Sequence, residues 1–269
     1  MKHYLLICLL LLQTMLFAQS DSLQQVLSTG EQVADFAVDN LGNIFLVYES
    51  GQLKKLSPKG VSIAVFNDVR RFGKIYTIDV SNPLKVLLFY KDFGTIVVLD
   101  RLLNNRNILD MRKQNIQQAK AIAQSYDNGV WVYDEVDGKL KRLDDNGTVT
   151  SETADFRVLF DAPPSPVTLV DANRLVYLYD PEKGLIILDY YGTLRNKIAL
   201  LGWSDVQVIG ERILGRKGQL LESYTAGSMN LREQDMKDLL DGVKKIQVSL
   251  DYLYCLKDGR LLVYSFIKR

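Results

Sequence analysis

Acidic side chains gather in two short turns of the sequence, where they could supply ligands for a cation. These side chains are Asp134, Glu135, Asp137, Asp180 and Glu182. Calcium prefers carboxylate and carbonyl oxygens, so either turn could contribute to a calcium site. Such a site needs carboxylates that converge on one point, whereas the two turns belong to separate strand–turn units. We therefore interpret the acidic residues as solvated turn charges and predict no bound metal.

Arginine and aromatic residues coincide in three connecting segments, and this composition is typical of the residues that dominate protein–protein binding. The candidate binding residues are Arg70, Arg71, Phe72, Phe156, Arg157, Phe160 and Trp203. We predict that they form a docking face for a protein. The alternative is structural, because a large ring in a connecting segment can also wedge between neighbouring packing units.

Tyrosine closes a recurring apolar segment of the chain. The four positions are Tyr48, Tyr90, Tyr133 and Tyr179. Phenols that recur at one end of a repeated unit could form a partial ring near a surface. We favour packing between units, with each hydroxyl reaching water or a loop carbonyl.

Histidine and cysteine are scarce in the chain. The single histidine is His3, and the cysteines are Cys8 and Cys255. His3 and Cys8 lie in an N-terminal segment that we expect to be removed. The remaining chain would then lack a nucleophile–histidine pair, a histidine base, histidine metal ligands and an intramolecular disulfide. Cys255 lies in the apolar run 252–256, and we interpret it as a small buried hydrophobe.

Residues 1–18 have the pattern of a cleavable secretory signal. Lys2 precedes an apolar run over residues 4–12, and the small residue Ala18 stands at the expected cleavage site. The run is shorter than the roughly 20 residues that a membrane-spanning helix needs. A membrane anchor and a buried first helix are the alternatives. We predict an exported protein, periplasmic or associated with the outer membrane, with no integral membrane segment after cleavage.

The charge balance argues against a nucleic-acid partner. The segment 1–18 contains one of the 33 Lys and Arg residues and none of the 32 Asp and Glu residues, so its removal leaves 32 of each sign. A protein that binds nucleic acid needs a basic excess to neutralise phosphates. We therefore expect no nucleic-acid partner.

A strand–turn pattern recurs through the rest of the chain and positions the segments above. The copies begin near residues 33, 74, 119, 167, 206 and 244. Each contains short runs rich in β-branched and aromatic residues, separated by Gly, Asn and Asp turns. A repeat of roughly 40–48 residues is typical of four-stranded propeller blades. The sequence therefore predicts an all-β fold, a single β-propeller of six four-stranded blades, with five or seven blades as alternatives because the fifth copy is divergent.

The ends of the repeat predict how the ring closes. The sixth copy stops after its third strand, and the segment 22–27 before the first copy resembles polar fourth strands such as 193–198. We predict that this N-terminal segment completes the last blade near residues 261–264, so that no blade lacks its edge strand. Two Gln-, Lys- and Asp-rich stretches, 112–119 and 231–240, are predicted as short connecting helices.

With these elements the chain resembles secreted six-bladed β-propellers of the NHL and TolB-like kind. The resemblance covers nearly all of residues 19–269 and rests on the period and the recurring strand–turn units. It implies a disc that binds ligands or proteins on one face, and some members of the group are calcium-dependent hydrolases or lactonases. The fold alone assigns no activity.

We expect residues 19–269 to form one propeller domain that acts as a non-enzymatic protein-binding module or scaffold in a bacterial cell envelope. The expected partner is an envelope protein, the expected state is a monomer, and no cofactor is expected. Two alternatives stay open. A calcium-dependent hydrolase would need three or four Asp, Glu or Asn side chains that converge at the mouth of the central channel. A glycan-binding protein would show an exposed flat aromatic side chain in a groove.

Overall fold

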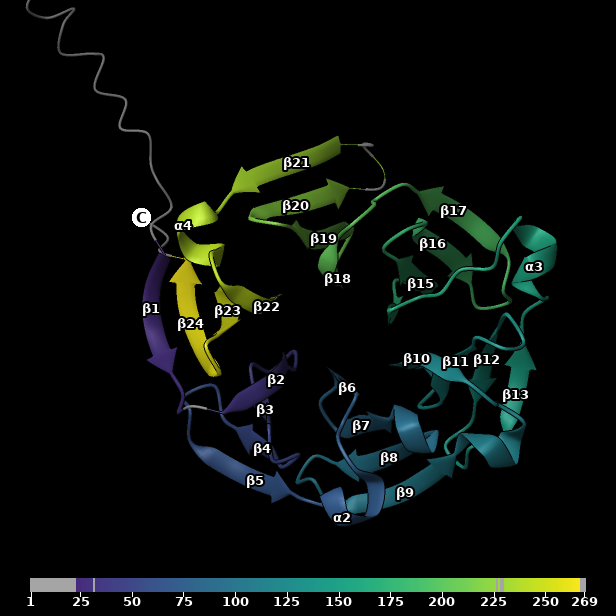
Figure 1. The fold of residues 1–269 in the computed structure, drawn as a ribbon, viewed down its shortest axis with the longest axis horizontal. Coiled ribbons are helices and arrows are strands. Elements are labelled where there is room, and N and C mark those ends of the chain that lie inside the picture. Colours follow the sequence, from purple (N-terminus) through teal and green to yellow (C-terminus); the bar gives the residue numbers. More distant parts are fainter. Residues whose placement is uncertain (1–22, 31, 226, 228–229, 267–269) are drawn as a thin grey trace, which may run out of the picture.

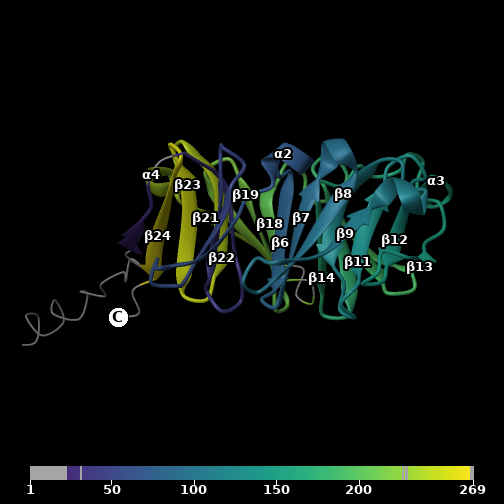
Figure 2. The same ribbon diagram turned by 90° about the horizontal axis from the view of Figure 1, so that it is seen from below.

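The computed structural model describes residues 23–30, 32–225, 227 and 230–266 of the chain. Within these residues, 24 strands form six antiparallel sheets of four strands each. The sheets stand around a central axis as blades, and the ring is a flat disc in the side view (Figure 1 and Figure 2). The predicted six-bladed propeller is confirmed. The predicted signal 1–18 lies outside the described residues.

The first three blades follow one another in sequence order. Blade 1 contains β2 (Val33–Val38), β3 (Ile44–Tyr48), β4 (Leu53–Leu56) and β5 (Ser62–Phe66). Blade 2 contains β6 (Thr77–Asn82), β7 (Lys85–Tyr90), β8 (Thr95–Asp100) and β9 (Asn105–Asp110). Blade 3 contains β10 (Ala119–Gln124), β11 (Val130–Asp134), β12 (Lys139–Leu143) and β13 (Val149–Glu152).

The last three blades complete the ring. Blade 4 contains β14 (Thr168–Ala172), β15 (Leu175–Asp180), β16 (Gly184–Asp189) and β17 (Leu194–Ile198). Blade 5 contains β18 (Ser204–Ile209), β19 (Arg212–Lys217), β20 (Leu220–Thr225) and β21 (Asn230–Asp235). Blade 6 contains β22 (Val243–Ser249), β23 (Tyr252–Lys257), β24 (Arg260–Phe266) and the N-terminal β1 (Leu23–Ser28).

The hydrophobic core lies between the blades. The middle strands β7 and β16 are buried along their whole length, because each blade packs against a neighbour on both faces. Their sequences are therefore near-continuous apolar runs and do not alternate between apolar and polar residues. Between blades 1 and 2, for example, Phe45 and Leu53 pack in one cluster with Val86. The outer strands face solvent, and every residue of β21 is exposed.

The N-terminal strand closes the ring as predicted. β1 pairs antiparallel with β24, and its register runs from Leu23 opposite Phe266 to Ser28 opposite Leu262. Just beyond β1, the backbone N–H of Thr29 donates to the carbonyl of Leu261 at 3.0 Å. Blade 6 thus combines the two ends of the described chain, and β1 covers the edge of β24 as the fourth strand of the blade.

Short helices mark one face of the disc. They are α2 (Val69–Phe72), α3 (Phe156–Leu159), α4 (Lys237–Leu240) and the 3-10 turns η1 (Lys91–Phe93) and η2 (Met111–Gln114). Figure 2 shows α2, α3 and α4 on the same side, which we call the loop face. The opposite side, the turn face, carries the turns that join the first strand of a blade to the second and the third to the fourth. No helix in the described part of the chain is long and apolar enough to cross a membrane.

The predicted helix over 231–240 is wrong for most of its length. Residues 230–235 form β21, which pairs with β20 from Leu220 opposite Asp235 to Thr225 opposite Asn230. Because β21 lies at the rim with every residue exposed, it carries no apolar alternation that would identify it as a strand. The helix α4 covers only the last residues of the stretch.

Candidate functional site

The predicted binding residues of α2 divide between the surface and the core. The ring of Phe72 is buried and lies against the ring of Tyr90, with 5.2 Å between centroids. The guanidinium of Arg71 lies 4.8 Å from the centroid of Phe72, and both Arg71 and Arg70 are exposed. The aromatic side chain therefore fixes the helix, and the arginines are presented to solvent.

The residues of α3 follow the same arrangement. The ring of Phe156 is fully buried and stacks on Tyr133 at 6.0 Å, while Phe160 packs edge-on against Phe156. Asp155 caps the helix by accepting the backbone N–H of Arg157 at 2.8 Å and its Nε at 2.9 Å. The Nη2 of Arg157 also donates to the carbonyl of Asp137 at 2.9 Å. The arginine remains exposed but is held in one place.

Trp203 is buried between blades 4 and 5. Its backbone N–H donates to the Oη of Tyr179 at 2.6 Å. Its ring covers Gly215, where a Cβ atom would lie only 2.1 Å from the tryptophan ring. The structure thus places the rings of Phe72, Phe156 and Trp203 between blades. That the exposed arginines bind a partner stays a prediction.

The closing tyrosines pack between units, as favoured from the sequence. Tyr90, Tyr133 and Tyr179 are buried, and the hydroxyl of Tyr133 donates to the carbonyl of Pro164 at 2.6 Å. Burial raises the pKa of each of these three phenols above its ordinary value. Tyr48 is half-buried at the edge of the cluster between blades 6 and 1.

The prediction of solvated turn charges is wrong for Asp134 and Asp180, which are buried and make contacts within the fold. The carboxylate of Asp134 is buried and pairs with the Nζ of Lys141 at 2.9 Å, and Asp137 pairs with the same ammonium. The carboxylate of Asp180 accepts the backbone N–H of Ser165 at 2.8 Å. Across the described residues, no group of three or more His, Cys, Asp or Glu side chains is placed to hold a metal ion.

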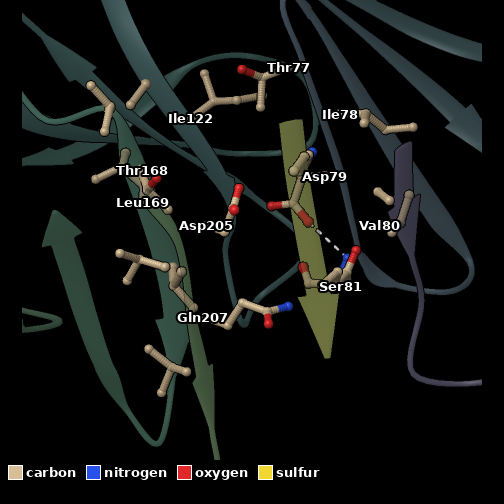
Figure 3. Close-up of a pocket in the computed structure, with 18 of the residues that line it drawn as sticks. Thr77, Ile78, Asp79, Val80, Ser81, Ile122, Thr168, Leu169, Asp205 and Gln207 are labelled. Atoms are coloured by element: carbon tan, nitrogen blue, oxygen red, sulfur yellow. Dashed lines mark hydrogen bonds between the residues drawn. The ribbon is translucent and has the colours of Figure 1, made fainter. Parts of the chain in front are cut away.

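A cavity of about 420 Å³ lies at the centre of the ring and is lined by the inner strands of all six blades (Figure 3). Much of its polar lining joins neighbouring blades. Asp79 accepts the backbone N–H of Gln124 at 2.7 Å, and Gln207 accepts that of Val248 at 2.9 Å. Gln247 both accepts from the backbone N–H of Val38 and donates to its carbonyl. These side chains are used to hold inner strands together.

Charged groups of the cavity are also paired. The carboxylate of Asp205 accepts the Nε of Arg216 at 2.8 Å and the backbone N–H of Ile246 at 3.1 Å. Burial raises the pKa of Asp205, although the arginine opposes the shift. The Nζ of Lys245 lies 2.6 Å from Asp35 of blade 1. The cavity can hold a small molecule by size, but these side chains already bond to one another.

A second cavity, of about 380 Å³, lies in the seam between blades 3 and 4. We call it the blade 3–4 groove and define it by Tyr126, Trp131, Arg142, Ser151, Tyr190 and Tyr191. The sequence does not indicate this groove, because its walls come from two blades. The one local signal is the pair Tyr190–Tyr191 in a tight turn, where small and polar residues are usual.

Comparisons with known proteins show the fold. No protein-family model matches the chain, and no curated protein matches its sequence. Among solved structures, a streptogramin B lyase matches with a TM-score of 0.62 and 13% identity, over 87% of this chain and 79% of that one. The Neurospora crassa Pan2 WD40 domain matches with a TM-score of 0.66 and 11% identity, over 93% and 97%.

BamB from Moraxella catarrhalis matches with a TM-score of 0.50 and 15% identity, over 92% of this chain and 99% of that one. At these identities the matches carry no information on activity or partner. The chain is a six-bladed β-propeller that is similar in fold to lyase, WD40 and BamB structures.

Proposed function

We propose that the chain is an exported, non-enzymatic binding module that docks a partner protein of the cell envelope on its loop face. Export is supported by the signal-like pattern of residues 1–18. The sequence resemblance to NHL and TolB-like propellers is consistent with docking on one face of the disc.

The observation that carries the proposal is the surface presented by α3. Val158 is 81% exposed and Leu159 is 45% exposed, next to Arg157 on the same helical turn. Val136 is also exposed, in the turn that contains the Asp137 carbonyl bound by Arg157. An exposed apolar group beside an arginine has the composition of a protein-binding centre.

The helix α3 is already held in place by the fold, and this supports the interpretation. The buried ring of Phe156 anchors α3 from below, and Asp155 fixes its first turn. Less conformational freedom is then lost on binding than for a mobile loop. Around α2 the loop face offers a second patch, where Arg70 and Arg71 are exposed.

Site-specific crosslinking tests the proposal in cells that produce the protein. A photo-crosslinking amino acid at Val158 should give a discrete adduct with one protein, whereas the same group at Leu250, on the turn face and 65% exposed, should not. Adducts of equal strength from both positions, or from Leu250 alone, would contradict docking on the loop face.

Point variants then measure the contribution of the arginines. Recovery of the crosslinked partner should fall for Arg71→Ala and Arg157→Ala, each of which we expect to cost about 2 kcal/mol of binding free energy. Lys59→Ala, an exposed residue of the turn face, is the control. Circular dichroism should first establish that all three variants fold, since Arg157 also contacts Asp137.

A further inference from the structure

The blade 3–4 groove contains side chains that are arranged as in a binding site. The packing of the two blades does not require this arrangement. Trp131 and Arg142 lie opposite each other on β11 and β12, and Ser151 lies opposite Arg142 on β13, so the three form one row across blade 3. Tyr190 and Tyr191 face this row from the turn between β16 and β17.

The aromatic rings of the groove are partly exposed, in contrast to the closing tyrosines of the blades. The rings of Tyr126 and Tyr190 stack in parallel, with centroids 4.1 Å apart and planes within 6°. Tyr126 is nevertheless 57% exposed, and Tyr191 is 92% exposed. Trp131 closes the inner end, 6.3 Å from Tyr190, and is buried. Because Tyr126 and Tyr190 cover one face of each other, the ring of Tyr191 is the flat apolar surface most open to a ligand.

One carboxylate holds this arrangement in place. Asp171 accepts the Nε1 of Trp131 at 2.8 Å, the Oη of Tyr190 at 2.8 Å and the backbone N–H of Tyr126 at 3.1 Å. The three donors come from two blades, so Asp171 fixes the aromatic walls relative to each other. A site whose rings are already ordered binds with a smaller entropic cost.

The charges of the groove restrict the chemistry of a ligand. The guanidinium of Arg142 lies 5.8 Å from the centroid of Tyr126 and 5.7 Å from that of Trp131, so a ligand cation would be repelled from these rings. Arg142 also pairs with Asp127 at 3.3 Å, and Glu152 lines the groove while paired with Lys139. These paired carboxylates give the groove no net attraction for an anion.

Hydrogen-bonding groups remain available beside the rings. Within the described residues, the hydroxyls of Ser151 and Tyr191 make no hydrogen bond, and each can donate and accept. The fitting ligand is therefore neutral, with a flat face of C–H groups to lie on the rings and hydroxyls at its edge. The negative face of an aromatic ring attracts such C–H groups.

We infer that the blade 3–4 groove is a carbohydrate-binding site that takes neutral sugar rings of a glycan. Its volume of about 380 Å³ is in the range of small-molecule sites. The inference does not depend on the proposed protein docking, because Tyr126 and Tyr191 lie in turns of the turn face, away from α2 and the exposed residues of α3.

Titration calorimetry with neutral oligosaccharides tests the inference. The probes are hexasaccharides of glucose, xylose, mannose and N-acetylglucosamine, with a proline-rich decapeptide as the competing class. At least one hexasaccharide should bind with a Kd below about 1 mM. Tyr191→Ala should weaken it at least tenfold and leave the fold intact, because that side chain is almost fully exposed.

Two further variants make the result specific. Asp171→Ala should also weaken binding, since it removes the acceptor of all three donors, and its circular dichroism spectrum reports whether it folds. Tyr76→Ala, an exposed tyrosine of the loop face, should bind like the parent. The inference is overturned if no hexasaccharide binds, if only the peptide binds, or if Tyr191→Ala and Tyr76→Ala behave alike.

Discussion

At the scale of single residues, the contact of Trp203 with Gly215 shows how tightly blades 4 and 5 fit. Gly215 lies in β19, where a side chain would enter the space of the indole ring. Gly215→Ala would place its Cβ 2.1 Å from that ring, so we expect unfolding free energy to fall by about 1–3 kcal/mol from overpacking. Denaturant unfolding measures the change.

The matched control for that substitution lies in the same blade. Gly227 has no atom within 4 Å of a built Cβ, so Gly227→Ala should leave stability nearly unchanged. Equal midpoints for the two variants would show that the ring of Trp203 does not occupy this space.

Cys255 provides a second test at this scale. Its side chain is buried in blade 6, and burial raises the pKa of the thiol to about 12. The thiolate is the reactive form, so the native thiol should resist iodoacetamide at about pH 8 and react only when denaturant unfolds the domain. Mass spectrometry of the peptide that contains Cys255 measures the labelling. Rapid labelling of the native protein would contradict the burial.

Residue type alone does not decide between two roles for the aromatic residues of the connecting segments. The aromatic residues Phe72, Phe156 and Trp203 were assigned to a docking face, because arginine with an aromatic neighbour has the same composition in a binding centre and in a blade wedge. Their actual neighbours, such as Tyr90 and Tyr133, come from different strands. The sequence alone does not bring these strands together, so it could not separate the two interpretations.

At the scale of the element, aspartate-capped turns recur on the turn face. In four turns the same carboxylate oxygen accepts the backbone N–H groups two and four residues later. The aspartates are Asp39, Asp100, Asp144 and Asp189. This arrangement fixes the turn between two strands by satisfying groups that the ladder leaves unpaired.

Acid should weaken the turn that Asp100 caps. Side-chain and backbone hydrogen bonds from Asn104 hold the pKa of Asp100 below its usual value, although burial opposes the shift. The unfolded chain therefore binds this proton at higher pH than the folded chain. The stabilisation is present above about pH 4 and is lost as the pH falls through the lowered folded value.

Thermal unfolding between about pH 7 and pH 2.5 checks this behaviour. The melting temperature of the parent should fall on acidification, and Asp100→Asn should show a smaller fall because it carries no titrating group there. Identical acid slopes in the two proteins would remove Asp100 from the explanation.

The elements that sequence patterns predicted worst are those at the rim. β21 was missed because it is polar on both faces, whereas β7 and β16 were recognisable from their apolar runs. The blade 3–4 groove was missed for a related reason. In the sequence, Trp131 and Tyr190 are ordinary strand and turn residues. Only the packing of blade 3 against blade 4 lets both side chains donate hydrogen bonds to Asp171.

At the scale of the whole molecule, ring closure should decide cooperativity. Deleting residues 23–30 removes the β1–β24 pairing and the packing of Leu27 against the cluster between blades 6 and 1. We expect the melting temperature to fall by about 10 °C and the transition to broaden, since an edge and its apolar face open together. Differential scanning calorimetry measures both quantities.

A point variant in the same strand is the control for this deletion. Gln25 is exposed, so Gln25→Ala keeps the backbone pairing with Tyr264 and should melt like the parent. A deleted form that melts like the parent would show that β1 does not stabilise the ring. The closure itself was predictable, because the last repeat lacks its fourth strand and one extra strand precedes the first repeat. Pairing these two ends is the arrangement that completes the last blade.

The pairing of β1 with β24 also sets the response of the disc to mechanical force. Leu23 and Phe266 are opposite each other at one end of the antiparallel pair, so the chain leaves both strands at the same point. Tension applied between these two points would load the backbone hydrogen bonds one after another, as in opening a zipper, instead of shearing them all at once. A disc pulled at Leu23 and Phe266 would therefore open at blade 6 under low force.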